Sequence, residues 1–210
     1  MPKELDADKD AEVAEDDHWL NDVWTFHFHD PDDQRWTLDS YRRLGDATSV
    51  EEFWELQDAI APHVRTGMFF MMREHVFPCW DDKHNIDGGC LSLKLTAEES
   101  PAAWELLLKR AIGETLVRDD ASAAALNGIS ISPKRGFCIV KIWLADDKHV
   151  TRAHLRLPDA YRGELVFRSN RENMQNFHTG VSFLDGGKPP PEKKLGASGG
   201  AYPARGQGEC

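Results

Sequence analysis

The sequence has few cysteines, no long apolar run and a deficit of basic residues. Its four cysteines contain no C-x-x-C pair, which argues against a zinc ribbon or a disulfide scaffold. Free thiols in a reducing compartment, the cytoplasm or the nucleus, are therefore expected. No stretch approaches the ~18 apolar residues that a membrane span needs, and the polar, acidic beginning is not expected to act as a secretory signal.

The charge balance limits how this chain could hold nucleic acid. With 25 basic and 36 acidic residues its formal net charge is −11, which argues against binding through bulk electrostatics. A nucleotide should instead be held locally, by stacking and a few placed cations. No glycine-rich phosphate loop, nucleophile elbow or H-E-x-x-H motif occurs, so we expect neither an enzyme nor a cofactor.

Composition predicts one folded domain between two tails. Residues 1–17 carry eight acids and two lysines and are expected to form a disordered arm. Residues 186–210 hold seven glycines and four prolines and are expected to form a flexible tail. The domain should therefore span residues 18–185.

Apolar alternation and cap signals predict an α+β fold. The expected strands are residues 23–29, 67–72, 91–95, 137–144 and 165–167. Ser49 and Glu52 form a capping box that should start a helix ending near Ala61, and Ser100 should be the N-cap of a second helix with Pro101 in its first turn. Acidic residues predict a third helix over 146–157. These elements favour a curved, mostly antiparallel sheet with helices on one face.

Tryptophan is abundant, with seven residues, and two of them stand beside charged clusters. Trp36 follows a polar loop, whereas Trp80 is followed at once by Asp81 and then by the glycine pair at 88–89. Two indole faces and one carboxylate form a receptor for a flat, positively charged ring that donates hydrogen bonds. A 7-methylguanine is such a ring.

Seven short motifs occur in an order that is typical of one protein family. They are His18-Trp19-Leu20 with Trp24, Gln34-Arg35-Trp36, Ser49 to Trp54, Phe77 to Asp81, Gly88-Gly89, Trp104 with Ile112-Gly113-Glu114, and Ile142-Trp143. Over about residues 18–185 the chain resembles the mRNA cap-binding translation initiation factor 4E family, as a divergent paralogue. The resemblance implies a cupped antiparallel sheet of about eight strands with three helices on the convex face.

The resemblance also implies ligand-binding roles. Trp36 and Trp80 would sandwich the methylated base, Asp81 would accept hydrogen bonds from its edge, and Trp143 would lie beside the methyl group. Asp81 stands where the family usually has glutamate and is one methylene shorter, so the affinity is expected to differ from that of the family. The residues implied to hold the triphosphate are Lys134 and Arg135, with Arg168 and Arg171 from the loop after the last strand.

The helical face would bind a partner, either an initiation factor 4G-like scaffold or a 4E-binding repressor, through a Tyr-x-x-x-x-Leu-Φ helix. The residues implied for this surface are His18, Val50, Trp54, Trp104 and Glu105. Trp19 replaces the family's usual proline, so partner choice is expected to differ. Trp104 also lies on the apolar stripe of its helix and has a second interpretation as a core residue.

Three other functions stay open at this point. The protein could be a cap-binding repressor that does not recruit the scaffold, or an interaction protein that has lost cap affinity. A metal-dependent hydrolase could use His27 and His29, with His75 and His84 later in the chain. The prediction is a monomeric, non-enzymatic protein that binds capped mRNA and no membrane.

Overall fold

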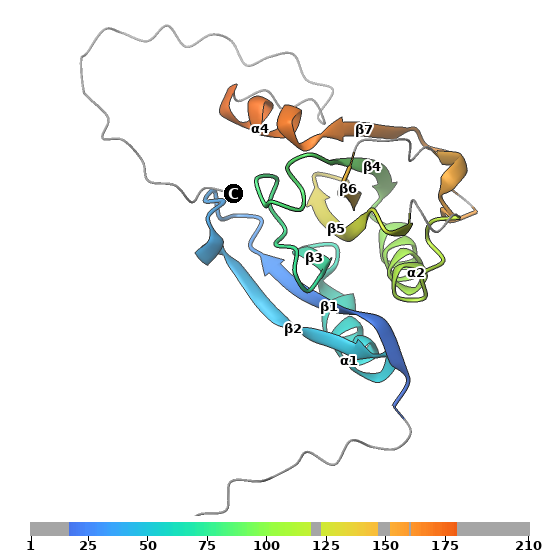
Figure 1. Cartoon of the computed structure of the whole chain (residues 1–210). Helices are drawn as coiled ribbons and strands as arrows, with labels where there is room; N and C mark the ends of the chain where they lie inside the picture. The colour runs from blue at the N-terminus through green and yellow to red at the C-terminus, as the bar shows by residue number, and fades with distance from the viewer. Residues whose placement is uncertain (1–16, 119–122, 147–151, 160, 180–210) are drawn as a thin grey trace, which may run out of the picture.

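One antiparallel sheet of seven strands organises the part of the chain that the computed structural model describes, residues 17–118, 123–146, 152–159 and 161–179 (Figure 1). The strands are β1 (Trp19–His29), β2 (Tyr41–Ser49), β3 (Met68–Arg73), β4 (Gly89–Thr96), β5 (Leu126–Lys134), β6 (Phe137–Leu144) and β7 (Leu165–Ser169). The helices are α1 (Val50–Ile60), α2 (Ser100–Ile112) and α4 (Asn170–Thr179), and the short 3-10 helices are η1 (Leu38–Ser40), η2 (Ala61–His63) and η3 (Arg152–His154). The strand order across the sheet is β2-β1-β3-β5-β6-β4-β7.

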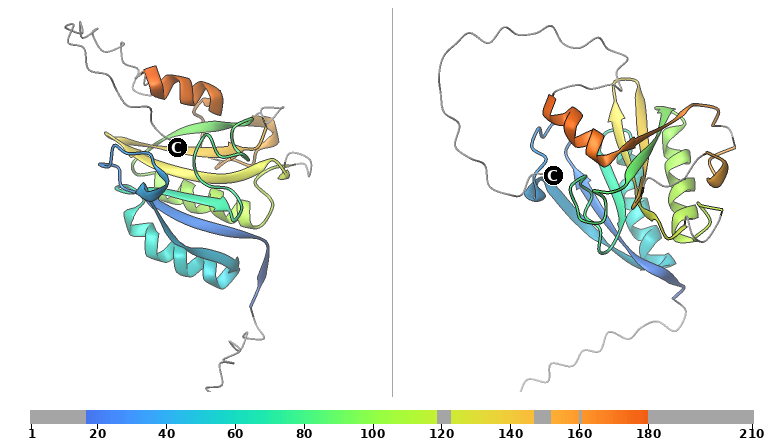
Figure 2. Two further views of the ribbon diagram at one scale, coloured as in Figure 1. Left: turned by 60° about the vertical axis from the view of Figure 1, so that its left-hand side comes forward. Right: turned by 45° about the horizontal axis from the view of Figure 1, so that its top comes forward.

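Helices α1 and α2 lie on the convex side of the curved sheet (Figure 1). Helix α1 begins as predicted: the Ser49 hydroxyl accepts a hydrogen bond from the Glu52 amide, and the Glu52 carboxylate accepts one from the Ser49 amide. Helix α4 follows directly on β7 and lies at the other end of the sheet from α1 (Figure 2). The residues of α1 and α2 that face the sheet supply much of the core.

Side-chain alternation along the strands separates two apolar clusters. On β1 and β3, Trp24, Phe26, Phe69 and Met71 point toward the helices and belong to the larger, helix-side cluster. The opposite face carries a smaller cluster, the open-face cluster, made of Met68, Phe70, Met72, Val76, Cys90 and Trp143. The helix-side cluster is the main core, and the open-face cluster is the floor of a surface that α1 and α2 do not cover.

The five predicted strands are confirmed as β1, β3, β4, β6 and β7, and the predicted bounds 137–144 match β6 at both ends. Strands β2 and β5 were not predicted as separate strands. Strand β2 starts with a Tyr-Arg-Arg run and lies at the sheet edge with few buried residues, so it carries little apolar alternation. The described residues hold seven strands, against about eight implied by the resemblance.

Two of the three predicted helices are confirmed, and the third is wrong within the described residues. The described part of residues 146–157 contains only the 3-10 helix η3, followed by Leu155 in an isolated bridge to Val117. Backbone groups on either side of Leu155 hydrogen-bond to the chain that follows α2. Over residues 152–157 this tertiary pairing stands in place of the predicted helix, and residues 147–151 lie outside the described residues.

The start of α2 also differs from the prediction. Ser100 is not its N-cap but its first helical residue, and its hydroxyl donates to the Ala97 carbonyl. The reciprocal side-chain and backbone bonds are made one turn earlier, between Thr96 and Glu99. Helix α4, which follows the last strand, was not predicted.

The remaining sequence predictions concern the cysteines, the two tails and a membrane span. Cys90 and Cys138 are free, as expected, and both are buried, whereas Cys79 is disulfide-bonded, which the sequence did not predict. The predicted tails, 1–17 and 186–210, lie outside the described residues apart from Asp17. No helix in the described part of the chain combines the length and the apolarity needed to cross a membrane.

Candidate ligand-binding site on the open face

Three tryptophans from separate parts of the chain meet on the open face of the sheet. Trp143 on β6 is a buried member of the open-face cluster, and Trp36 and Trp80 are half-buried and pack against that cluster. The Trp143 indole N–H donates to the Ser130 hydroxyl at 2.9 Å, which holds this ring against the neighbouring strand β5. The structure therefore gathers three of the four residues predicted to surround the base.

The Trp36 ring stacks on the imidazole of His29, with centroids 4.1 Å apart and planes 6° apart. His29 is fully buried, and its Nε2–H donates to the Arg35 carbonyl at 2.8 Å. The Tyr41 ring packs edge-on against both His29 and Trp36, at 5.0 and 6.2 Å between centroids. One face of Trp36 is thus supported by protein, so a planar ligand would stack on the other face.

Three buried asparagines hold the loop that carries Trp80. Asn85, within this loop, donates to two carbonyls of the same loop at 2.9 and 2.8 Å. Asn127 on β5 donates to the Asn85 side-chain oxygen at 2.9 Å, and Asn170 at the start of α4 donates to the Asn85 carbonyl at 2.7 Å. Because buried amides with satisfied hydrogen bonds are rigid, this network fixes the loop to both β5 and α4.

The loop ends in two glycines that no larger residue could replace. A Cβ atom at Gly88 would lie 1.8 Å from the Leu144 carbonyl oxygen, and one at Gly89 would lie 2.4 Å from the Arg168 carbonyl oxygen. Such distances are far below van der Waals contact. The glycine pair therefore lets the Trp80 loop join β4 in close contact with β6 and β7.

Asp81 supplies a carboxylate next to Trp80. Partial burial raises the pKa of this carboxyl, and the negative charge of Asp82 adds to the increase. Asp81 lies near Tyr41. Burial is the main reason that the pKa of the Tyr41 hydroxyl is raised, and the negative charge of Asp81 raises it further. No lysine, arginine or histidine in the described part of the chain forms an ion pair with Asp81. This carboxylate is thus placed to accept hydrogen bonds from a ligand.

A lysine that the sequence analysis did not single out lies beside Trp80. The Lys141 Nζ is 5.2 Å from the centroid of the Trp80 ring. Burial lowers the pKa of this ammonium group, the Cys90 thiol opposes that decrease, and the positive charges of Lys134 and Arg168 add smaller decreases. The alternation of β6 could have identified Lys141, because it lies two residues before Trp143 and shares its face.

The four residues predicted to hold phosphate come from three places. Lys134 ends β5, and Arg135 lies in the turn to β6; both are exposed. Arg168 and Arg171 were expected in a loop, but Arg168 lies on β7 and Arg171 on α4. Arg171 forms an ion pair with Asp87 at 2.6 Å, which takes up part of its charge.

A family model described as "Eukaryotic initiation factor 4E" matches residues 19–189. The chain belongs to this family. Initiation factor 4E-4 of Caenorhabditis elegans is 32% identical over 77% of each chain. Initiation factor 4E of Saccharomyces cerevisiae is 30% identical over 62% of this chain and 64% of its own length. That of Eremothecium gossypii is 29% identical over 60% of this chain and 62% of its own length. The match therefore spans less than two thirds of these two fungal relatives.

Solved structures with the same fold belong to this family too. C. elegans eIF4E-3, in a complex with the 4E-binding protein Mextli and a cap analog, has a TM-score of 0.65 at 19% identity, covering 76% of this chain and 96% of that one. Ascaris suum eIF4E-3, in a complex with an m2,2,7G cap, has a TM-score of 0.57 at 20% identity, covering 63% and 76%. The predicted α+β class and curved antiparallel sheet are thereby confirmed.

The partner-binding residues expected in this initiation factor 4E family member lie mostly around α1. His18 is exposed, its Nδ1 lies 2.9 Å from the Glu51 carboxylate, and its carbonyl accepts a hydrogen bond from the Val50 amide at 2.8 Å. Trp54 is half-buried, and the Lys109 Nζ lies 5.7 Å from its ring centroid. These contacts leave an accessible surface at the start and along one side of α1.

Trp104 does not belong to that surface. It is fully buried in the helix-side cluster, and its indole N–H donates to the Gln57 side chain of α1 at 3.2 Å. Its assignment as a partner contact is therefore wrong, and the core interpretation is correct. Glu105, the next residue, is half-buried and forms an ion pair with Lys109 at 2.9 Å.

The histidines considered for a metal site do not assemble one in the described residues. That part of the chain contains no group of three or more His, Cys, Asp or Glu side chains that could hold a metal ion. The Nδ1 atoms of His27 and His29 are buried without a hydrogen-bond partner, and His75 packs edge-on against His84 at 4.8 Å. Burial, followed by the charge of Arg43, lowers the pKa of His27 to about 4.

This lowered pKa predicts a pH-dependent stability. The unfolded chain protonates His27 near pH 6.5 and the folded chain near 4, so stability is complete above about 6.5 and decreases as the pH falls toward 4. At about 1.36 kcal/mol per pKa unit, His27 should remove about 2 kcal/mol of unfolding free energy between pH 7.5 and 5. Urea unfolding at both pH values should show a smaller loss in His27→Phe than in the wild type. His63→Gln, at an exposed histidine, is the control; equal losses in His27→Phe and wild type would contradict the prediction.

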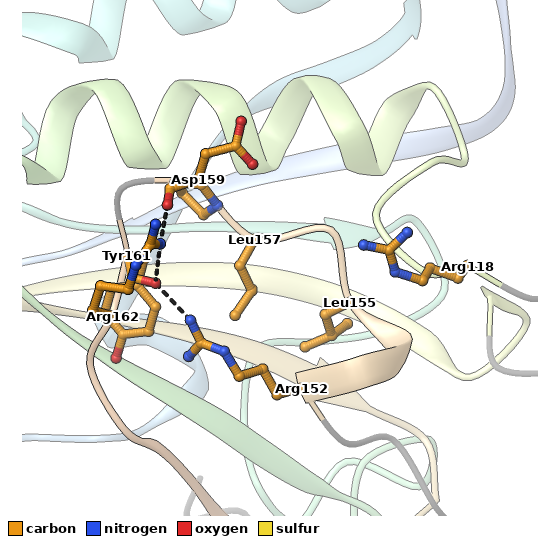
Figure 3. Close-up of a pocket in the computed structure, with 8 residues that line it drawn as sticks. Arg118, Arg152, Leu155, Leu157, Asp159, Tyr161 and Arg162 are labelled. Carbon is orange, nitrogen blue, oxygen red and sulfur yellow. Dashed lines mark hydrogen bonds between the residues drawn. The ribbon is translucent and has the colours of Figure 1, made fainter.

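A separate hollow of about 460 Å³ borders the helix-side cluster near η3 (Figure 3). Its lining residues are Arg118, Arg152, Leu155, Leu157, Pro158, Asp159, Tyr161 and Arg162. Arg152 donates to the carbonyls of Tyr161 and Gly163 at 2.5 and 2.9 Å, and Arg162 donates to the Asp159 carbonyl. These bonds hold the loop before β7 in place, and none of the predicted ligand-binding residues lines the hollow.

Proposed function

We propose that this chain binds the 7-methylguanosine 5′ cap of mRNA, with the methylated base stacked between Trp36 and Trp80. The observation that carries the proposal is the placement of both indoles on the open-face cluster beside Asp81, a carboxylate with no cation paired to it among the described residues. Methylation at N7 makes the base cationic, so stacking gains a cation–π contribution. Asp81 would accept hydrogen bonds from the base edge, and Trp143 would lie beside the methyl group.

The proposed role is non-enzymatic, in translation initiation, through a partner bound at α1. Among solved relatives, the C. elegans protein was captured with both a cap analog and a 4E-binding protein, which supports two separate binding surfaces. Here the exposed residues around α1 would receive a scaffold or repressor helix. Trp19 is 61% exposed at the edge of this surface and stands where the family usually has proline, which favours a different choice of partner.

Titration with 7-methyl-GTP and with GTP tests the proposed function. We expect tryptophan fluorescence to be quenched strongly by 7-methyl-GTP, because the base would stack on two of seven indoles, and weakly by GTP. Calorimetry on the same samples gives the affinities independently of fluorescence. Equal or absent responses to the two nucleotides would overturn the proposal.

Asp81→Asn is expected to weaken binding of 7-methyl-GTP. A hydrogen bond to a charged group contributes about 1.5–3 kcal/mol, so the dissociation constant should rise about 10- to 100-fold. Because burial raises the pKa of Asp81, wild-type affinity should also fall as the pH is lowered through that increased pKa, as the acceptor is protonated. Asp82→Asn serves as the matched control; a similar loss in both variants would indicate a general charge effect instead.

A further inference from the structure

Lys141 is a half-buried cation without a counter-charge. It lies in the middle of β6 with β4 and β5 on either side, and no carboxylate among the described residues lies within ion-pair distance of its Nζ. Lysines are seldom buried unless they are paired, because removing an ammonium group from water is costly. An unpaired lysine in the middle of a sheet therefore points to a ligand that supplies the negative charge.

The groups around Lys141 add positive charge and do not neutralise it. Its partners in the β-sheet register are Ser92 on β4 and Ser130 on β5, which are neutral. Lys134 and Arg168 lie close enough for their charges to act on it. The nearby Cys90 thiol is no counter-charge, since burial raises its pKa to about 12. Cations from β5, β6 and β7 thus converge on the open face, an arrangement that favours a polyanion.

Lys141 also lies over the Trp80 indole, the ring on which the base would stack in the proposed function. Its ammonium group lies 5.2 Å from the Trp80 ring centroid, within the range of a cation–π contact. A cationic base that stacks on Trp80 would be repelled by this ammonium unless the lysine moves away or its charge is neutralised. A 5′ phosphate attached to the same base could do both, because it offers the ammonium an anionic acceptor.

We propose that Lys141 binds the phosphate chain of a nucleotide whose cationic base stacks on Trp80. The ammonium group would leave the indole for the phosphate, and this movement would couple binding of the phosphate to stacking of the base. The inference rests on the proposed function and extends it to the ligand class. The ligand must carry both a positively charged base and at least one 5′ phosphate. A methylated nucleoside without phosphate would have to stack on Trp80 while the Lys141 ammonium group still lies over that ring.

The experiment compares 7-methyl-GTP with 7-methylguanosine by calorimetry, in wild type and in Lys141→Met. Methionine keeps the length and apolar volume of the lysine stem without its charge. We expect the variant to bind 7-methyl-GTP about ten-fold more weakly and 7-methylguanosine as well as the wild type or better. The ratio of the two affinities should therefore fall about ten-fold or more. Lys141→Arg should retain the ratio, because it keeps a cation at this position.

Lys109→Met is the matched control, since Lys109 also lies over a tryptophan, Trp54, but on the helix side of the sheet. It should leave both affinities unchanged. Equal losses for the two ligands in Lys141→Met, at unchanged thermal stability, would mean that Lys141 only positions Trp80 and would overturn the inference. An unchanged ratio would overturn it as well. Failure of the wild type to bind 7-methyl-GTP would instead overturn the proposed function and, with it, this inference.

Discussion

Trp80→Ala is expected to lose most of the discrimination between 7-methyl-GTP and GTP. Stacking of a base on an aromatic ring contributes about 1–3 kcal/mol, and a partly desolvated cation–π contact about 0.5–2 kcal/mol more. Affinity for 7-methyl-GTP should therefore fall about 100-fold, whereas the weaker binding of GTP, which lacks the cationic ring, should fall less. The dissociation constants of both nucleotides, measured by calorimetry, give the ratio directly.

The protein offers a close control for this experiment. Trp54 is also a half-buried tryptophan, but it lies on α1, on the helix side of the sheet. Trp54→Ala should leave binding of both nucleotides unchanged. Near-wild-type discrimination in Trp80→Ala would mean that the base does not stack on this indole, and the surface around α1 would then become the principal candidate for function.

Trp104→Ala is expected to have the largest effect on stability. Trp104 is fully buried between α2 and the sheet, and its loss would leave a cavity and an unpaired Gln57 side chain on α1. Truncation of a buried tryptophan to alanine costs about 3–5 kcal/mol. Urea unfolding followed by circular dichroism should show this decrease in the unfolding free energy, a large part of the total for a single domain.

Comparison with Trp54→Ala separates the two roles that the sequence allowed for Trp104. The Trp54 variant should lose about 1 kcal/mol of stability or less, because its ring is already partly in water, and should lose affinity for a Tyr-x-x-x-x-Leu-Φ peptide. A Trp104 variant with wild-type stability and impaired peptide binding would contradict the burial described above and would restore the partner-contact assignment.

Local patterns predicted the parts of the fold that depend on near neighbours in sequence. The Ser49–Glu52 capping box and the alternation of β1 and β6 each involve residues within one element, and each is confirmed. The third helix is wrong over residues 152–157, because pairing of Leu155 with Val117, distant in sequence, determines that part of the segment. Strand β2 was not predicted, since an edge strand with exposed arginines carries little apolar signal.

The residues of the candidate site divide in the same way, into those that near neighbours in sequence identify and those that only the fold brings together. The tryptophans and Asp81 could be named from motifs, because their neighbours in the sequence are distinctive. The stack of His29 on Trp36 and the position of Lys141 over Trp80 could not, since each joins a strand to a loop through the fold. The pairing of Arg171 with Asp87 likewise depends on where α4 packs. Charge at the site is therefore distributed differently from what the order of basic residues suggested.

The separation of two apolar clusters by a single sheet has a consequence for how such a protein can change. Along β1, Trp24 and Phe26 belong to the core that holds the helices, whereas His27 and His29, at alternate positions, face the ligand side. Substitutions at the first set alter folding free energy alone, whereas those at the second also alter the groups that face the ligand. Ligand preference can thus diverge between members of a lineage, one alternate residue at a time, while the scaffold persists.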